Sequence, residues 1–184
     1  MLALLPVALA LQLAAAPDTQ KPTVKAVIKT SMGVIELELD RKKAPLSVDN
    51  FVKYAKDGQY TKTIFHRVIS NFMIQGGGLD DKMKDRPVRA PVPNESLNGL
   101  QNLRGTIAMA RTSNPDSATC QFYINLKDNN FLDGQVGKPG YTVFGKVVKG
   151  MDVVDKIAAS RTGNAGGMPD VPVAPVYIES VTVE

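Results

Sequence analysis

Apolar and polar residues alternate along most of the chain, with the period of two that is typical of half-buried β-strands. In residues 23–39 this alternation predicts two strands around a turn that ends at Gly33, with Glu36 and Glu38 set between apolar neighbours. The polar, proline-rich residues 79–102 predict a long surface loop. Six further segments are expected to be strands: 63–69, 72–77, 105–110, 120–126, 141–148 and 171–183, with prolines only in the approach to the last.

Two segments change to the helical period of 3.6 residues. In residues 44–58, Pro45 suits the first turn of a helix and Gly58 suits its end, and residues 150–163 form the second segment. Each has one apolar face, made of Val48, Phe51, Val52 and Ala55 in the first segment and of Val153, Val154, Ile157 and Ala158 in the second. Many short strands and two widely separated helices favour a mostly β fold, a closed antiparallel barrel with helices over its openings, although periodicity alone does not establish closure.

The composition is that of an ordinary globular domain. The chain has 184 residues, 43% of them hydrophobic and 22% charged, and no repeat or linker divides it. Its net charge of +4 comes from scattered lysines and arginines, which argues against a nucleic-acid partner. With one histidine and one cysteine, the chain can form no intramolecular disulfide and lacks the ligands of a typical zinc site, so no metal is expected.

The first residues predict an export signal. Residues 1–16 are apolar, uncharged and rich in alanine towards their end, and a polar tail, residues 17–22, follows. The apolar run is shorter than the about 20 residues that a spanning helix needs, so no stable membrane insertion is expected after cleavage. An uncleaved anchor or a buried N-terminal helix are the alternatives, and cytoplasmic location is the alternative to export.

Two sets of side chains offer conventional acid–base or nucleophilic chemistry. Cys120 and His66 are the one conceivable thiol pair, but Cys120 lies in an apolar strand, where a lone cysteine is usually a buried structural residue. Acidic pairs such as Asp80 with Asp81 lie in a polar segment and have the pattern of solvated charges. Neither set predicts a catalytic centre.

Arg67 is the more informative residue, because it is a permanent cation in the apolar segment "FHRVISNFMIQGGG". Along the two strands of this segment Arg67, Met73 and Gln75 share parity, and His66 should point to the opposite side from Arg67. A cation, an amide and apolar surface on one face suit an apolar ligand that carries a carbonyl, such as a peptidyl-prolyl unit. The glycines that follow predict a strand exit with close backbone approach.

Four motifs resemble those of cyclophilin-type peptidyl-prolyl cis-trans isomerases: "FHRVISNFMIQGGG", "GTIAMARTSNPDSATCQFYINL", "NNFLDG" and "YTVFGKVVKGMDVVDKI". They occur in the family's order over nearly all of residues 23–184, and their amino-acid sequences are most similar to those of the bacterial periplasmic branch. The resemblance implies an eight-stranded antiparallel β-barrel closed by two α-helices. It also implies catalysis of X-Pro rotation in folding polypeptides without any cofactor, in the periplasm if the chain is exported.

The resemblance also assigns the site. Arg67 is implied to be the essential catalytic residue, and Gln75 to help orient it. The implied substrate-binding residues are Phe72, Met73, Ala110, Arg111, Gln121, Tyr123, Phe131, Leu132 and Tyr141. A proline-peptide-binding chaperone without significant turnover would use the same pocket and is the alternative, and neither reading requires more than a monomer.

The chain departs from the common family pattern around this pocket. Tyr123 replaces a usual phenylalanine and adds a hydroxyl that needs a partner. Phe131 and Tyr141 stand where many eukaryotic members have tryptophan and histidine, so only weak cyclosporin binding is expected. Arg111 replaces a common asparagine, which predicts some preference for peptides with acidic residues.

Overall fold

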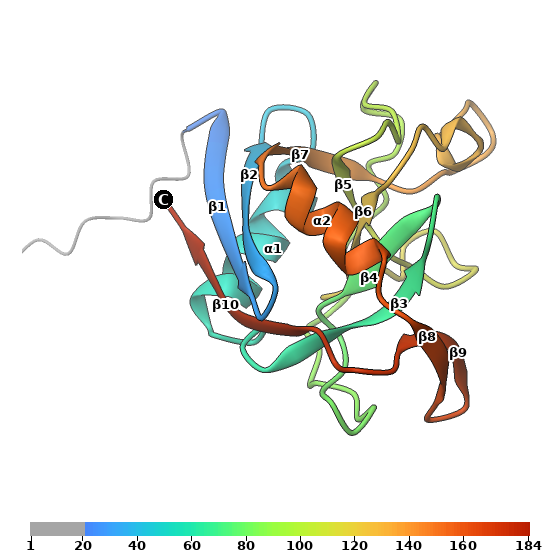
Figure 1. The fold of residues 1–184 in the computed structure, drawn as a ribbon. Helices are drawn as coiled ribbons and strands as arrows, with labels where there is room; N and C mark the ends of the chain where they lie inside the picture. The colour runs from blue at the N-terminus through green and yellow to red at the C-terminus, as the bar shows by residue number, and fades with distance from the viewer. Residues whose placement is uncertain (1–20) are drawn as a thin grey trace, which may run out of the picture.

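A computed structural model of the protein describes residues 21–184, and their chain forms one closed barrel (Figure 1). The predicted export signal and most of the tail, up to residue 20, lie outside the described residues. Eight strands close the barrel in the spatial order β1-β10-β3-β4-β6-β5-β7-β2, and every neighbouring pair is antiparallel. Their bounds are β1 Thr23–Thr30, β2 Gly33–Asp40, β3 Thr63–Ile69, β4 Met73–Gly76, β5 Thr106–Met109, β6 Phe122–Asn125, β7 Val143–Lys149 and β10 Tyr177–Val183. The predicted fold class is therefore confirmed.

The period of two in the sequence places the barrel core. In β1 and β2 every second side chain points inward and is buried, whereas the lysines and glutamates between them are partly or fully exposed. The inward side chains of these two strands are Val24, Ala26, Ile28, Ile35, Leu37 and Leu39. Since successive side chains of a strand point to opposite faces, this alternation fixes which side of the sheet faces the core.

Helix α1 (Pro45–Lys56) and helix α2 (Met151–Ala158) lie on opposite sides of the barrel, α2 in front and α1 behind in Figure 1. The predicted face of α1 is buried, and its Phe51 ring packs against the rings of Tyr60, Phe122 and Phe144 at centroid distances of 5.1, 5.7 and 5.6 Å. In α2, Val154 and Ile157 are fully buried, while the rest of the predicted face packs on the core from its edge.

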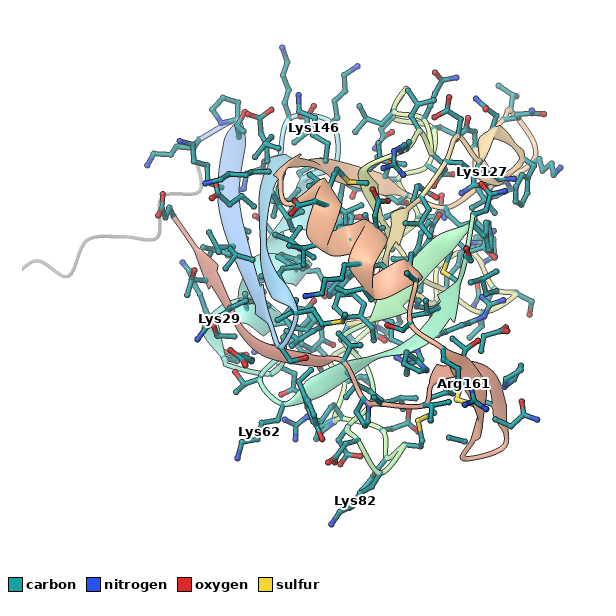
Figure 2. The ribbon with its side chains drawn as sticks, viewed as in Figure 1. Lys29, Lys62, Lys82, Lys127, Lys146 and Arg161 are labelled. Atoms are coloured by element: carbon teal, nitrogen blue, oxygen red, sulfur yellow. The ribbon has the colours of Figure 1, made fainter. Side chains whose placement is uncertain are left out.

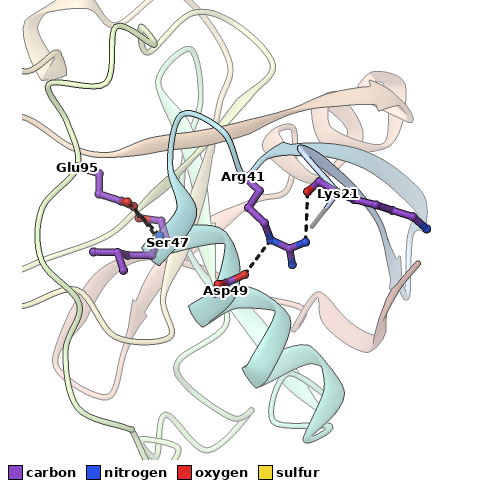
Figure 3. Close-up of polar contacts among 6 residues, drawn as sticks. Lys21, Arg41, Ser47, Asp49 and Glu95 are labelled. Carbon is purple, nitrogen blue, oxygen red and sulfur yellow. Dashed lines mark hydrogen bonds and ion pairs between the residues drawn. The ribbon is translucent and has the colours of Figure 1, made fainter. Parts of the chain in front are cut away.

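The N-terminus of α1 is capped from a distant part of the chain (Figure 3). Ala44, the residue before the helix, has no side chain that can cap. Instead, the Glu95 carboxylate accepts hydrogen bonds from the backbone N–H groups of Leu46 and Ser47, at 3.0 and 2.8 Å, and from the Ser47 hydroxyl. A carboxylate at a helix N-terminus satisfies free donors and complements the helix dipole, so Glu95 ties the 79–102 segment to α1.

Four features differ from the sequence-based expectations. A second, two-stranded sheet of β8 (Thr162–Ala165) and β9 (Met168–Pro172) was not predicted, and the last barrel strand begins at Tyr177 instead of residue 171. A short 3-10 helix, η1 (Asn130–Leu132), lies between β6 and β7, where the sequence patterns predicted no element. Segment 79–102 is not wholly a surface loop. Its residues Ser96 and Asn102 are buried and form hydrogen bonds with residues that are distant in the sequence.

Basic side chains project from separate sides of the described molecule, as the six labelled residues of Figure 2 show. Among residues 21–184, no helix combines the length and apolar character needed to cross a bilayer.

Candidate active site

A small pocket of about 110 Å³ lies on the outer face of the barrel, where β3, β4 and β6 meet η1 and the segments that follow β5 and precede β7. Its lining brings together nine of the residues predicted from the sequence. They are Arg67, Phe72, Met73, Gln75, Ala110, Arg111, Tyr123, Leu132 and Tyr141. The two other predicted residues adjoin it, because Gln121 is hydrogen-bonded to Gln75 and Phe131 is stacked on Phe72.

Strand register sets the central row of this pocket. Arg67 on β3 pairs with Gln75 on β4, and Gln75 pairs in turn with Tyr123 on β6. A register shift between Phe65 and Arg67 leaves His66 as the extra residue of β3. Directly paired residues lie on the same face of a sheet, so pairing aligns the cation, the amide and the phenol side by side.

Arg67 is half-buried, and its guanidinium makes no hydrogen bond or ion pair with any residue in 21–184. A guanidinium carries five N–H donors and stays charged at any physiological pH. The donors of Arg67 are therefore available to a ligand that occupies the adjoining apolar pocket.

Gln75 does not hold Arg67 through a direct hydrogen bond in this structure. Its Nε2 donates to Gln121 Oε1 at 2.8 Å, which fixes the amide beside the pocket. The glycines after Gln75 allow this arrangement: Gly77 has a positive φ of 87°, and a side chain at Gly78 would overlap Gln121. The predicted close approach at the glycine run is confirmed, and Gln75 constrains Arg67 through strand pairing.

Tyr123 forms the floor of the pocket. It is 4% exposed and packs with Met73, Ala108 and Val143 in a small apolar cluster separate from the main core. Its hydroxyl donates to Asn102 Oδ1 at 2.7 Å, so the predicted need for a partner is met within the protein. Burial raises the pKa of Tyr123 well above its ordinary value, which keeps the phenol neutral.

Arg111 is a structural clamp at one wall of the pocket. Its Nε and Nη2 donate to the carbonyls of Gly140 and Pro139 at 3.1 and 3.0 Å, and its Nη1 donates to Thr112 at 2.9 Å. Its guanidinium carbon lies 4.4 Å from the ring centre of Tyr141, in cation–π geometry. Because these groups occupy most of its donors, any preference for acidic peptides must come from its charge alone.

Phe131 forms an exposed lip over the pocket. Its side chain is 68% exposed and its ring stacks on that of Phe72, with centroids 5.8 Å apart and planes inclined by 21°. The Phe72–Phe131 stack offers a flat apolar surface at the pocket entrance.

His66 and Cys120 lie outside the pocket and are buried. Burial lowers the pKa of His66, so the imidazole is held neutral inside the barrel wall. Burial also raises the pKa of the Cys120 thiol, the opposite of what a nucleophilic cysteine requires. The structure thus gives both residues the structural roles expected from their sequence context.

Other hollows on the described surface lack comparable chemistry. The groove of about 310 Å³ that is lined by Glu38, Asp40 and Leu103 has its glutamate engaged in an ion pair with Lys146. Within residues 21–184, no three His, Cys, Asp or Glu side chains gather closely enough to hold a metal ion. The small pocket beside Arg67 is therefore the candidate active site.

Comparison with known proteins agrees with this geometry. Residues 25–183 match the family described as cyclophilin type peptidyl-prolyl cis-trans isomerase/CLD. The chain is 58% identical over 157 residues to a peptidyl-prolyl cis-trans isomerase of Acinetobacter baylyi, covering 85% of this chain and 84% of the relative. It is 52% identical over 157 residues to peptidyl-prolyl cis-trans isomerase B of Escherichia coli, covering 84% of this chain and 96% of that relative.

Solved structures are similar in fold. A cyclophilin-type isomerase of Cryptosporidium parvum, crystallised in the presence of the dipeptide Ala-Pro, superposes with a TM-score of 0.73 at 24% identity, over 87% of this chain and 98% of the other. A cyclophilin from Hirschia baltica superposes with a TM-score of 0.68 at 22% identity, over 88% of this chain and 76% of the other.

Proposed function

Because the chain belongs to the cyclophilin-type peptidyl-prolyl cis-trans isomerase family, its activity is the cis–trans isomerisation of peptidyl-prolyl bonds, and we propose that this occurs in the pocket beside Arg67. The observation that carries the assignment is a guanidinium with free donors at the edge of an apolar pocket, within residues 21–184. Such a site suits a prolyl ring whose amide nitrogen or carbonyl needs a donor.

The barrier that the enzyme must lower is electronic. Twisting an X-Pro bond costs about 18–20 kcal/mol, because resonance gives the C–N bond partial double-bond character. In the twisted amide the prolyl nitrogen regains its lone pair and becomes a hydrogen-bond acceptor. A catalyst therefore needs groups that bind the twisted amide better than either planar isomer.

Each wall of the pocket has a part in this mechanism. The apolar walls, Phe72, Met73, Tyr123 and Leu132, hold the prolyl ring and exclude water from it. With the ring fixed, the Arg67 guanidinium donates to the prolyl nitrogen as its lone pair develops. Neither a covalent intermediate nor proton transfer is needed, because the reaction is a rotation about the C–N bond in which no covalent bond is formed or broken.

Arg67→Ala tests this assignment in a protease-coupled assay of an Ala-Pro peptide. Losing one donor aimed at transition-state charge is expected to lower kcat/KM by about 10²–10³. Arg161→Ala is the matched control, because Arg161 is an exposed arginine outside the pocket lining. Near-normal turnover of Arg67→Ala would show that the reaction does not use this guanidinium.

The substrates that we propose are proline-containing segments of unfolded or partly folded polypeptides. The pocket is small and open at the surface, so it fits one prolyl residue in an extended segment. Phe131 offers no indole N–H to cyclosporin, which supports weak binding of that inhibitor.

We also propose that the protein is exported to the periplasm. The support is the apolar, alanine-rich composition of residues 1–16 followed by a polar tail. N-terminal sequencing of the protein purified from its own cells tests export directly. A mature chain that begins after residue 16 is expected, and an intact Met1 would contradict the proposal.

A further inference from the structure

Three asparagines lie buried directly beneath the proposed proline pocket. Asn102, Asn125 and Asn129 are each 0% exposed, although asparagine is mostly a surface residue. A buried amide is costly unless its donors and acceptors are used, so the partners of these side chains show what they are for.

Asn102 joins the pocket floor to the segment after η1. Its Oδ1 accepts from the Tyr123 hydroxyl at 2.7 Å and from Asn125 Nδ2 at 3.3 Å. Its backbone N–H and its Nδ2 both donate to Asp133 Oδ1, at 2.7 and 2.9 Å. The position of the Tyr123 ring is therefore tied to the chain that directly follows Leu132.

Asn129 joins two further apolar walls, Phe72 and Leu132. Its Nδ2 donates to the backbone carbonyl of Phe72 at 3.0 Å and to Asn125 Oδ1 at 2.8 Å. The backbone carbonyl of Asn129 accepts from the backbone N–H of Leu132 at 2.9 Å, and its backbone N–H donates to the backbone carbonyl of Asn102 at 2.7 Å. Phe72, Tyr123 and Leu132 thus converge on two linked asparagines.

One atom of this network is left unsatisfied. Asn129 Oδ1 is buried and has no hydrogen-bond partner among the described residues. A buried acceptor without a partner lowers stability, and such local violations concentrate at functional sites. The bond from Asn129 Nδ2 to the Phe72 carbonyl holds one pocket wall in place in spite of this cost.

We propose that Asn102 and Asn129 are positioning residues. They set the spacing of three of the four apolar walls that hold the prolyl ring against Arg67, namely Phe72, Tyr123 and Leu132. Asn102 acts through the Tyr123 hydroxyl, which it draws away from the pocket so that only apolar ring surface faces the substrate. The Asn129 side chain acts through the backbone carbonyl of Phe72 and through Asn125. This inference rests on the proposed placement of the active site in this pocket.

A rescue experiment separates positioning from simple stability. Asn102→Ala leaves the Tyr123 hydroxyl without its acceptor, and we expect kcat/KM to fall about tenfold, mainly through KM. Adding Tyr123→Phe removes the stranded hydroxyl, so the double variant should recover to within about threefold of Tyr123→Phe alone. Asn129→Ala should raise KM in the same way, but Tyr123→Phe should not rescue it.

The controls address folding and the site assignment. Tyr60→Phe removes a buried hydroxyl that donates to Cys120 outside the pocket, so it should lower Tm without changing KM. If Asn102→Ala does not fold, Asn102→Ser takes its place in both the single and the double variant. Equal losses in kcat/KM with and without Tyr123→Phe would overturn the positioning role.

Arg67→Ala in the same assay distinguishes the two levels of the proposal. An inactive Arg67→Ala together with absent rescue would overturn only the role of the asparagines. A fully active Arg67→Ala would show instead that the pocket itself is wrongly assigned.

Discussion

Replacing Arg111 separates two things that this residue brings to the pocket, its positive charge and its hydrogen-bonding geometry. The guanidinium bridges the carbonyls of Thr112, Pro139 and Gly140 while it lies over the ring of Tyr141. A lysine keeps the charge but has no planar fork that could reach all of these groups. Arg111→Lys should therefore loosen this wall of the pocket while it leaves the net charge unchanged.

The size of the effect follows from these contacts. Three charged donors to backbone carbonyls and one cation–π contact are lost, but all are partly exposed and therefore weakened by solvent. We expect the free energy of unfolding to fall by about 1–3 kcal/mol. For a domain of this size that corresponds to a decrease in Tm of roughly 2–12 °C. Since Tyr141 borders the pocket, kcat/KM should fall about threefold through a higher KM.

Thermal unfolding and the protease-coupled assay measure both quantities on the same samples. Arg89→Lys is the matched control, because Arg89 also lies over a tyrosine, at 5.8 Å from the Tyr54 ring centre, but outside the pocket. It should lower Tm without raising KM. Peptides with glutamate or glutamine before the proline residue then test the charge: a preference for glutamate should persist in Arg111→Lys and vanish in Arg111→Met. An Arg111→Lys variant with unchanged Tm and KM would refute the clamp.

Acidification should destabilise the fold through His66: burial lowers its pKa, so the unfolded chain binds a proton that the folded chain does not. The free energy of unfolding should thus fall as pH drops below about 6.5, by at most about 1.4 kcal/mol per pH unit, and the same slope in His66→Gln would contradict this cause. Glu95→Gln weakens the α1 cap and should lower the free energy of unfolding in urea by about 1 kcal/mol with kcat/KM unchanged, whereas the exposed Glu179→Gln should have little effect. Phe131→Trp adds an N–H donor and aromatic area at the pocket entrance, so the inhibition constant of cyclosporin should decrease. An unchanged inhibition constant would show that residue 131 does not contact cyclosporin.

Local sequence patterns predicted most of the barrel because the period of two is itself a property of strands with one buried face. The β8–β9 hairpin was missed because its strands carry few apolar residues, although Gly166 and Gly167, both with positive φ, are a recognisable hairpin turn signal. Closure of the barrel needed the structure, since the β1–β10 pairing joins the two ends of the domain.

The candidate site was predicted in part for the same reason. The shared parity of Arg67, Met73 and Gln75 survives the intervening turn, and the structure places all three in one pocket. The orientation of Arg111 and the burial of Asn102 could not be predicted, because both depend on carbonyls or carboxylates far away in the sequence. In a single sequence, a polar residue in a polar segment carries no sign of such burial.

Exchange NMR of an Ala-Pro peptide with Arg67→Ala tests the central claim most directly, because it reports binding and cis–trans exchange in one sample without a coupled protease. Shift changes of the prolyl ring resonances show whether the pocket still binds, and exchange cross-peaks give the rate of rotation. We expect the peptide to bind Arg67→Ala but to isomerise almost as slowly as it does without enzyme, with a time constant of tens to hundreds of seconds. Bound peptide that exchanges at the wild-type rate would contradict it.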